Sequence, residues 1–212
     1  MFTIAIQAGG ESRRMGQDKG LMLFLGKPMV VRVLQQVAHL AGELLVTTNH
    51  PDSYRFLGVR LMPDLLPGHG ALGGLFTALS AAHYPAVAVV ACDMPFANAG
   101  LLAVAHELLW SSGSDVVIPR TDRGLEPFHA LYRRETCLPA VKATLEAGKR
   151  RVDAWFPQVS VRYLSAVEML PFDPQQLAFR NVNTPEELHQ AETLVREMES
   201  GPSQLLAGGR GE

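Results

Sequence analysis

Apolar and polar positions follow two alternating rhythms along the chain. Short, almost wholly apolar runs predict buried strands, and between them apolar residues recur at helical spacing. The apolar runs are residues 2–6, 43–49, 59–63, 86–92 and 115–119, and the helical stretches are residues 30–41, 75–82 and 101–110. Strands and helices that alternate with short joints are typical of a parallel β-sheet.

We therefore predict an α/β fold, a Rossmann-like three-layer sandwich around a mostly parallel central sheet. Residues 127–132 follow a turn at residues 121–124 and predict a return strand, which indicates an antiparallel excursion at the sheet edge. Thr184, Pro185 and Glu187 mark the start of a last helix to about residue 198. We expect one domain over residues 1–200, followed by a flexible tail at residues 201–212.

Composition and charge narrow the function classes. The chain has 212 residues, of which 47% are hydrophobic, and its net charge of −2 favours neither nucleic acid nor an anionic membrane as a partner. The longest apolar run falls far short of the ~20 residues of a membrane span. The N-terminal Met-Phe-Thr-Ile has no basic region, so we expect no signal peptide. Cys92 and Cys137 have no C-x-x-C or zinc-ligand spacing, so we expect a reducing, cytoplasmic location.

Residues 8–19 form a glycine-rich, basic loop directly after the first strand. Adjacent Gly9 and Gly10 allow backbone N–H groups to turn toward an anion, and Arg13, Arg14 and Lys19 add positive charge. The spacing is neither that of the dinucleotide-binding G-x-G-x-x-G motif nor that of the Walker loop, because Gly20 follows Lys19. The loop predicts a phosphate-binding site of another kind.

Asp93 follows the most apolar run, which we expect to be the central strand. Ligands of open α/β sheets bind at the carboxyl ends of the strands, where Asp93 would be a ligand of Mg²⁺ bound to nucleotide phosphates. The alternative is that Asp93 only caps the next helix or bonds a turn amide. For Asp64, a turn role and a binding role are nearly balanced.

Three further features have both a binding and a structural interpretation. The glycine-rich segment 64–74, predicted to be a loop, would let a base or ribose approach the backbone, or it is only a connector. Asn181 and Asn183 would face the same side of an extended chain and bind a polar ligand, or one of them helps Thr184 to start the helix. Residues 149–151, Lys-Arg-Arg, are either a second anion clamp or a solvated charged run.

Five segments in order resemble one family of nucleotidyltransferases. They cover the chain from the first strand to the last helix: residues 9–19, 64–75, 92–95, 126–132 and 181–188. Together they resemble the molybdenum cofactor guanylyltransferases, the MobA family, which are small relatives of the sugar-nucleotide pyrophosphorylases. Any one segment is moderately specific, whereas five in the right order are strong.

The resemblance implies a reaction and a set of roles. The terminal phosphate of molybdopterin would attack the α-phosphate of GTP and release pyrophosphate, with Mg²⁺ as cofactor. The catalytic residues would be Lys19, Asp93 and Arg14. Transient protein partners that take part in delivery of the cofactor are a further possibility. The nucleotide would be held by Ala8, Gly9, Gly10, Lys19, Asn49, Asp64 and Asp93, with Asp93 as the metal ligand, and the pterin would face Arg150, Arg151, Asn181 and Asn183.

The sequence departs from the family pattern at two positions. Gln7 replaces an apolar residue and should place an amide near the nucleotide, and Ala71 replaces a proline and should make segment 64–74 more flexible. A cytidylyltransferase of the same pathway is the nearest alternative, although Gly9-Gly10 and Asp18-Lys19 favour guanine. The chain offers little room for the larger lobe of a sugar-phosphate nucleotidyltransferase. A non-catalytic nucleotide-binding module would not need both Lys19 and Asp93.

Overall fold

One twisted β-sheet runs through the protein in our computed structural model, which describes residues 1–8 and 18–200. The strand order is β10-β7-β9-β6-β1-β4-β5, and β8 pairs with β7 beyond that path. The strands are β1 Phe2–Gln7, β4 Ala41–Thr47, β5 Arg60–Met62, β6 Ala86–Ala91, β7 Val116–Thr121, β8 Gly124–Leu125, β9 His129–Arg133 and β10 Val161–Leu164. A separate small hairpin pairs β2 Leu23–Phe24 with β3 Lys27–Pro28.

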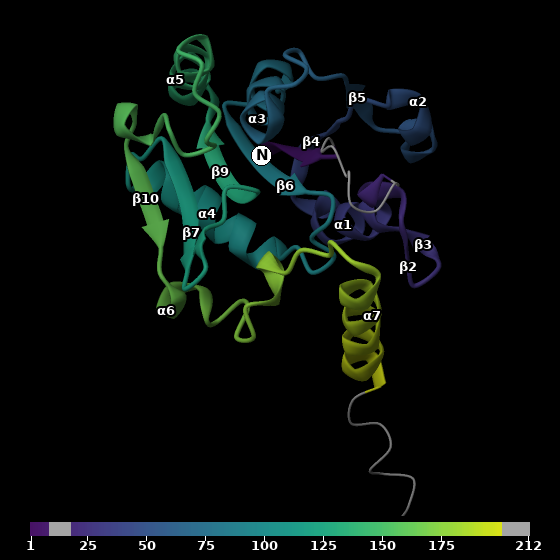
Figure 1. Cartoon of the computed structure of the whole chain (residues 1–212). Coiled ribbons are helices and arrows are strands. Elements are labelled where there is room, and N and C mark those ends of the chain that lie inside the picture. Colours follow the sequence, from purple (N-terminus) through teal and green to yellow (C-terminus); the bar gives the residue numbers. More distant parts are fainter. Residues whose placement is uncertain (9–17, 201–212) are drawn as a thin grey trace, which may run out of the picture.

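Helices cover both faces of this sheet, as the predicted three-layer sandwich requires (Figure 1). α1 (Met29–Val37) and α4 (Ala99–Ser111) pack on one face, and α3 (Gly70–Ala81) and α5 (Arg134–Glu146) pack on the other. The remaining α-helices are α2 Pro51–Tyr54, α6 Ala166–Met169 and α7 Pro185–Ser200. The short 3-10 helices are η1 Lys19–Leu21, η2 Ala38–Leu40, η3 Arg55–Leu57, η4 Phe156–Gln158 and η5 Leu177–Phe179.

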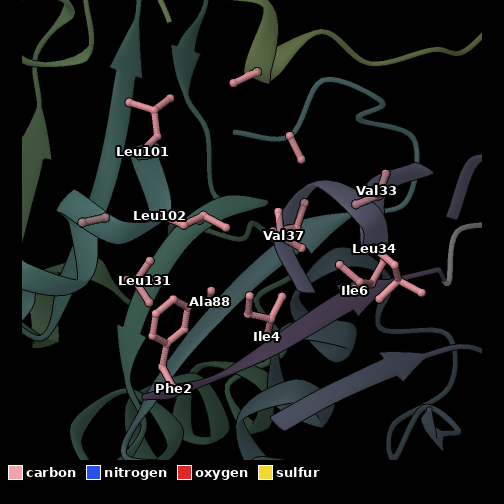
Figure 2. Packing of buried hydrophobic residues seen from close by; sticks show 14 of the residues in the cluster. Phe2, Ile4, Ile6, Val33, Leu34, Val37, Ala88, Leu101, Leu102 and Leu131 are labelled. Carbon is pink, nitrogen blue, oxygen red and sulfur yellow. The ribbon is translucent and has the colours of Figure 1, made fainter. Parts of the chain in front are cut away.

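The core is made by strands that are apolar on both faces. Figure 2 shows Ile4 and Ile6 of β1 packing against Val33, Leu34 and neighbouring side chains of α1 and α4. Ala5 of the same strand points to the opposite face, into the cluster under α3 and α5. Burial on both faces explains why the central strands are continuous apolar runs, so the predicted fold class is confirmed.

The antiparallel excursion lies at a different place from the one predicted. β9 pairs antiparallel with β7, as expected, but it also pairs antiparallel with β6 and therefore lies inside the sheet. The prediction of an excursion at the sheet edge is wrong. β9 carries buried residues such as Ala130 and Leu131, and a strand with two apolar faces is more stable in the sheet interior than at an edge.

The glycine-rich segment 64–74 is only partly a loop. Helix α3 begins at Gly70 and includes Gly73 and Gly74, and Ala71, expected to loosen a loop, lies in its first turn. A Cβ added at Gly73 would lie 3.1 Å from the carbonyl oxygen of Leu66, so the glycines permit close packing of a helix. Packing against the sheet outweighs the low helix propensity of glycine.

The last helix starts as predicted. Glu187 N–H donates to Thr184 Oγ1, and Glu187 Oε2 accepts from the Thr184 backbone N–H, which together form a capping box. The predicted tail at residues 201–212 lies outside the described residues. No helix in the described part of the chain combines the length and the apolar character needed to cross a membrane.

Candidate active site

The carboxyl ends of neighbouring parallel strands bring distant parts of the chain together. β1 pairs in parallel with β4 and with β6, and β5 extends the sheet beyond β4. The ladder continues just past the strands, because Ala8 N–H donates to Thr47 O at 2.8 Å and Cys92 N–H donates to Gln7 O at 3.1 Å. Asn49, Asp64 and Asp93 each follow one of these strands by two residues. The sheet therefore presents these three residues along the edge formed by the carboxyl ends of its parallel strands.

Lys19 is the centre of a polar cluster at this edge. Its Nζ donates to Asp93 Oδ2 at 3.1 Å and to Asn183 Oδ1 at 2.5 Å, across sequence separations of 74 and 164 residues. The Lys19 and Asp93 side chains are 26% and 16% exposed, so the ion pair is shielded from solvent but still reachable. Three residues proposed from separate segments thus meet at one point.

The segment of residues 181–188 is fixed through its backbone to the turn at Asp93 that follows β6. Val182 N–H donates to Asp93 O at 2.9 Å, and the Val182 side chain is fully buried. Asn183 N–H donates to Glu187 Oε2 at 2.6 Å, so the start of α7 orients the residue that contacts Lys19. Asn181 is exposed beside Val182. The structure therefore brings the Asn183 side chain into the cluster around Lys19. The Asn183 backbone also takes part in the start of α7, so both interpretations of this residue hold.

Lys19 is held locally by its neighbours in sequence. Asp18 caps η1, and its Oδ1 accepts the backbone N–H of Gly20 at 3.0 Å. The same oxygen accepts the hydroxyl of Tyr54, at the end of α2, at 2.5 Å. Sequence reasoning missed Tyr54, because a single tyrosine after a short polar segment carries no pattern of its own.

Asn49 and Asp64 form a second polar pair further along the edge. Burial raises the pKa of the Asp64 carboxyl above its ordinary value, and the nearby Asn49 amide offsets part of this rise. A partly desolvated carboxyl beside an amide is suited to accept N–H or O–H groups of a ligand. The binding role of Asp64 stays a prediction.

Gln7 joins the end of β1 to the start of α3. Its Nε2 donates to Ala71 O at 3.3 Å. Among residues 1–8 and 18–200, neither the buried Gln7 Oε1 nor the buried Thr47 Oγ1 has a hydrogen-bond partner. A Cβ at Gly74 would lie 2.0 Å from Gln7 Nε2, so glycine is needed there to make room for the amide. Ala8 follows with a buried side chain. Gly9, Gly10 and Arg14 lie outside the described residues, so their predicted roles stay predictions.

His129 supports the Asp93 loop without access to solvent. Its Nε2 accepts the backbone N–H of Asn98 at 2.9 Å, and its ring packs edge-on against Phe179. Complete burial lowers the pKa of His129 to about 4, so the ring is neutral near pH 7 and Nε2 is free to accept. This agrees with a packing role rather than a role as a base.

The basic segment at residues 149–151 is divided between two places. Arg150 Nη1 donates to Gly68 O at 2.9 Å, which ties it to the segment before α3. Arg151 pairs with both carboxylate oxygens of Asp153 and lines a groove of about 460 Å³. The other lining residues come from β7, from its connection to β9 and from residues 152–156: Ile118, Gly124, Leu125, Pro127, Val152, Asp153 and Phe156. Sequence patterns missed this groove because it forms between segments distant in the chain.

The site suits a divalent cation that shares its ligands with a phosphorylated substrate. In the part of the chain that the structure describes, no three His, Cys, Asp or Glu side chains gather into a ready-made metal site. Asp93 supplies one partly exposed carboxylate beside the lysine. One carboxylate with phosphate oxygens and waters is an arrangement that a hard, phosphate-bridging cation accepts. The residues present therefore fit such a cation.

Comparison with known proteins agrees with the site geometry. Residues 4–161 match the MobA-like NTP transferase domain. A probable molybdenum cofactor guanylyltransferase from Pelotomaculum thermopropionicum is 36% identical over 94% of this chain and 96% of its own length. The molybdenum cofactor guanylyltransferase of Desulfosudis oleivorans is 31% identical over 90% of this chain and 94% of its own length.

Solved structures agree with this assignment. Molybdopterin-guanine dinucleotide biosynthesis protein A from Archaeoglobus fulgidus superposes with a TM-score of 0.80 at 26% identity, over 92% of this chain and all of its own. A 4-diphosphocytidyl-2C-methyl-D-erythritol synthase from Anaerococcus prevotii shares the fold with a TM-score of 0.68 at 13% identity, over 92% of this chain and 97% of its own. The family resemblance inferred from the sequence is confirmed: the chain belongs to the MobA-like NTP transferase family.

Proposed function

We propose that this protein transfers GMP from GTP to the terminal phosphate of molybdopterin. A phosphate oxygen of molybdopterin attacks the α-phosphorus of GTP. The bond between that phosphorus and the oxygen bridging to the β-phosphate breaks, and its electrons leave with pyrophosphate. The product is the guanine dinucleotide form of the cofactor. Relatives that match nearly the whole chain carry the name molybdenum cofactor guanylyltransferase, which supports this reaction.

The observation that carries the proposal is the contact of Lys19 with both Asp93 and Asn183 at the carboxyl edge of the sheet. A lysine, a carboxylate and an amide in one cluster can hold a triphosphate, its cation and the attacking phosphate within reach of each other. No residue needs to act as a covalent nucleophile. Positioning and neutralisation of charge on the α-phosphate supply most of the catalysis.

The nucleotide side of the site follows from the same edge. Lys19, with Ala8, Gly9, Gly10 and Arg14, would hold the GTP phosphates. Mg²⁺, held by Asp93 and phosphate oxygens, would neutralise charge that develops on the α-phosphate. Asn49 and Asp64 follow β4 and β5 by two residues each. They would bind the guanosine part, where a carboxylate and an amide can accept and donate hydrogen bonds.

The pterin side is best placed on the other flank of Asp93, toward β7. The groove beside Arg151 is lined by apolar side chains that include Leu125 and Phe156, and the Arg151 guanidinium is exposed. A flat heterocycle with a phosphate suits such a surface, because the ring packs on apolar side chains and the phosphate pairs with arginine. Arg150, Asn181 and Asn183 would complete this side. A cytoplasmic location stays a prediction.

Nucleotide titration tests the choice of base. In calorimetry with Mg²⁺, we expect GTP to bind in the micromolar range and CTP to bind at least about tenfold more weakly, the discrimination that one lost hydrogen-bonding pair supports. ATP is the second comparison, because it keeps the purine but reverses the hydrogen-bonding pattern of guanine. Tight binding of CTP without binding of GTP would overturn the guanine assignment and favour a cytidylyltransferase.

Arg151→Ala tests the pterin groove. We expect the KM for molybdopterin to rise about tenfold, because a charge-assisted pair with phosphate is lost, while the affinity for GTP is unchanged. Arg55→Ala is the matched control, since Arg55 is similarly exposed and also pairs with a nearby aspartate, Asp52. Equal molybdopterin KM values for Arg151→Ala and Arg55→Ala would place the pterin elsewhere.

A further inference from the structure

Tyr54 has its ring in the core and its hydroxyl at the edge of the active site. The residue is completely buried at the end of α2, in the cluster that contains Val30 and Val33 of α1. Its Oη donates to Asp18 Oδ1 at 2.5 Å, a short hydrogen bond to a carboxylate. Packing alone requires only the ring, so the hydroxyl needs a separate explanation.

The Tyr54 hydroxyl is a donor to Asp18. Burial raises the pKa of Tyr54 far above its ordinary value, so the phenol keeps its proton near neutral pH and can donate it to Asp18. Asp18 Oδ1 also accepts the N–H of Gly20. The Asp18 carboxylate is thus held between two fixed donors, the Tyr54 hydroxyl from the core and the Gly20 N–H two residues along the chain.

Gly20 is shaped to this contact. A Cβ at position 20 would lie 2.4 Å from Tyr54 Oη and 3.3 Å from the ring, so any other residue would displace the phenol or the backbone. Asp18 and Gly20 therefore both rest on Tyr54, and Lys19 lies between them. The backbone of Lys19 is fixed on either side, while its ammonium extends to Asp93 and Asn183.

We propose that Tyr54 is a positioning residue for the transfer reaction, which holds Asp18 and Gly20 and thereby sets where the Lys19 ammonium lies. The inference rests on the proposed role of Lys19. It also links the two parts of the nucleotide site, because α2 begins two residues after Asn49. The segment that contacts the guanosine part thus also fixes the phosphate lysine.

The test is Tyr54→Phe, which keeps the ring and removes one oxygen. We expect the kcat for pyrophosphate release from GTP and molybdopterin to fall roughly tenfold, and the Kd for GTP to weaken, since one hydrogen bond to a charged group is lost. The thermal midpoint should stay within a few degrees of wild type. Tyr84→Phe is the matched control, because Tyr84 lies before β6 at the opposite edge of the sheet and should leave kcat unchanged.

A double-mutant cycle separates positioning from general destabilisation. If Tyr54 acts through Asp18, the Asp18→Asn and Tyr54→Phe losses overlap, and the double variant is little slower than the slower single variant. Independent, multiplying losses would overturn the inference, as would wild-type kinetics of Tyr54→Phe.

Lys19→Ala, run in parallel, separates the inference from the function on which it rests. An inactive Lys19→Ala with a fully active Tyr54→Phe defeats only the positioning role. A fully active Lys19→Ala defeats the proposed role of the lysine, and the inference with it.

Discussion

Replacing Asp93 by alanine is expected to slow pyrophosphate release from GTP and molybdopterin by about 10³-fold or more. The carboxylate is the proposed protein ligand of Mg²⁺, and a cation that neutralises the α-phosphate contributes several kcal/mol to the transition state. The same change removes the partner that Lys19 Nζ contacts at 3.1 Å. The measurement is steady-state pyrophosphate release as a function of Mg²⁺ concentration.

Asp93→Asn separates the two losses. The amide keeps the shape and an oxygen for Lys19 but removes the negative charge, so we expect nearly the full loss of activity together with weaker dependence on Mg²⁺. Asp52→Ala is the control, because Asp52 is exposed on α2 and pairs only at the surface with Arg55. Full activity of Asp93→Ala would eliminate the metal assignment.

Lys19→Ala is expected to lower kcat/KM for GTP by about 10²- to 10³-fold, since a fixed positive charge on the phosphates is lost. The loss should divide between weaker GTP binding and slower chemistry. Lys19 also bridges Asp93 and Asn183. Its removal leaves a carboxylate that is only 16% exposed without its cationic partner. Calorimetry with GTP and single-turnover kinetics measure the two parts separately.

The comparison for Lys19 is Lys142→Ala. Lys142 is exposed on α5, pairs with Glu146 and lies on a helix that contributes no proposed site residue. Its loss should leave both Kd and kcat unchanged. A Lys19→Ala protein that binds GTP and turns it over like Lys142→Ala would show that the phosphates are held by other groups.

The sequence predicts the fold best where burial of apolar side chains alone decides the structure. The runs around Ile4 and Val89 are apolar on both faces, so burial alone identifies central strands, and their order in the chain implies a parallel sheet. β9 is also apolar, but its place between β6 and β7 depends on which neighbours it pairs with. Local periodicity carries no information about such long-range pairing, which is why the edge position was predicted.

The site residues also fall into two groups, those that a local sequence pattern indicates and those that only the packed structure reveals. Asp93 and Asn183 could be found because each stands beside a recognisable strand end or helix start. The role of Tyr54 depends on a hydroxyl that meets Asp18 across 36 residues, and no spacing rule connects the two. Gly74 was read as part of a loop, although it is a helical glycine that makes room for the Gln7 amide. Contacts of this kind follow only from the packed structure.

The bond from Val182 to Asp93 has a consequence for the making of the protein. The domain match ends at residue 161, yet Asn183 contacts Lys19 and Val182 pairs with the backbone of Asp93. A chain still on the ribosome that has exposed only its first 160 residues holds Lys19 and Asp93 without the segment that contacts both of them. The cluster of Lys19, Asp93 and Asn183 can therefore be completed only after residues 182 and 183 have left the ribosome.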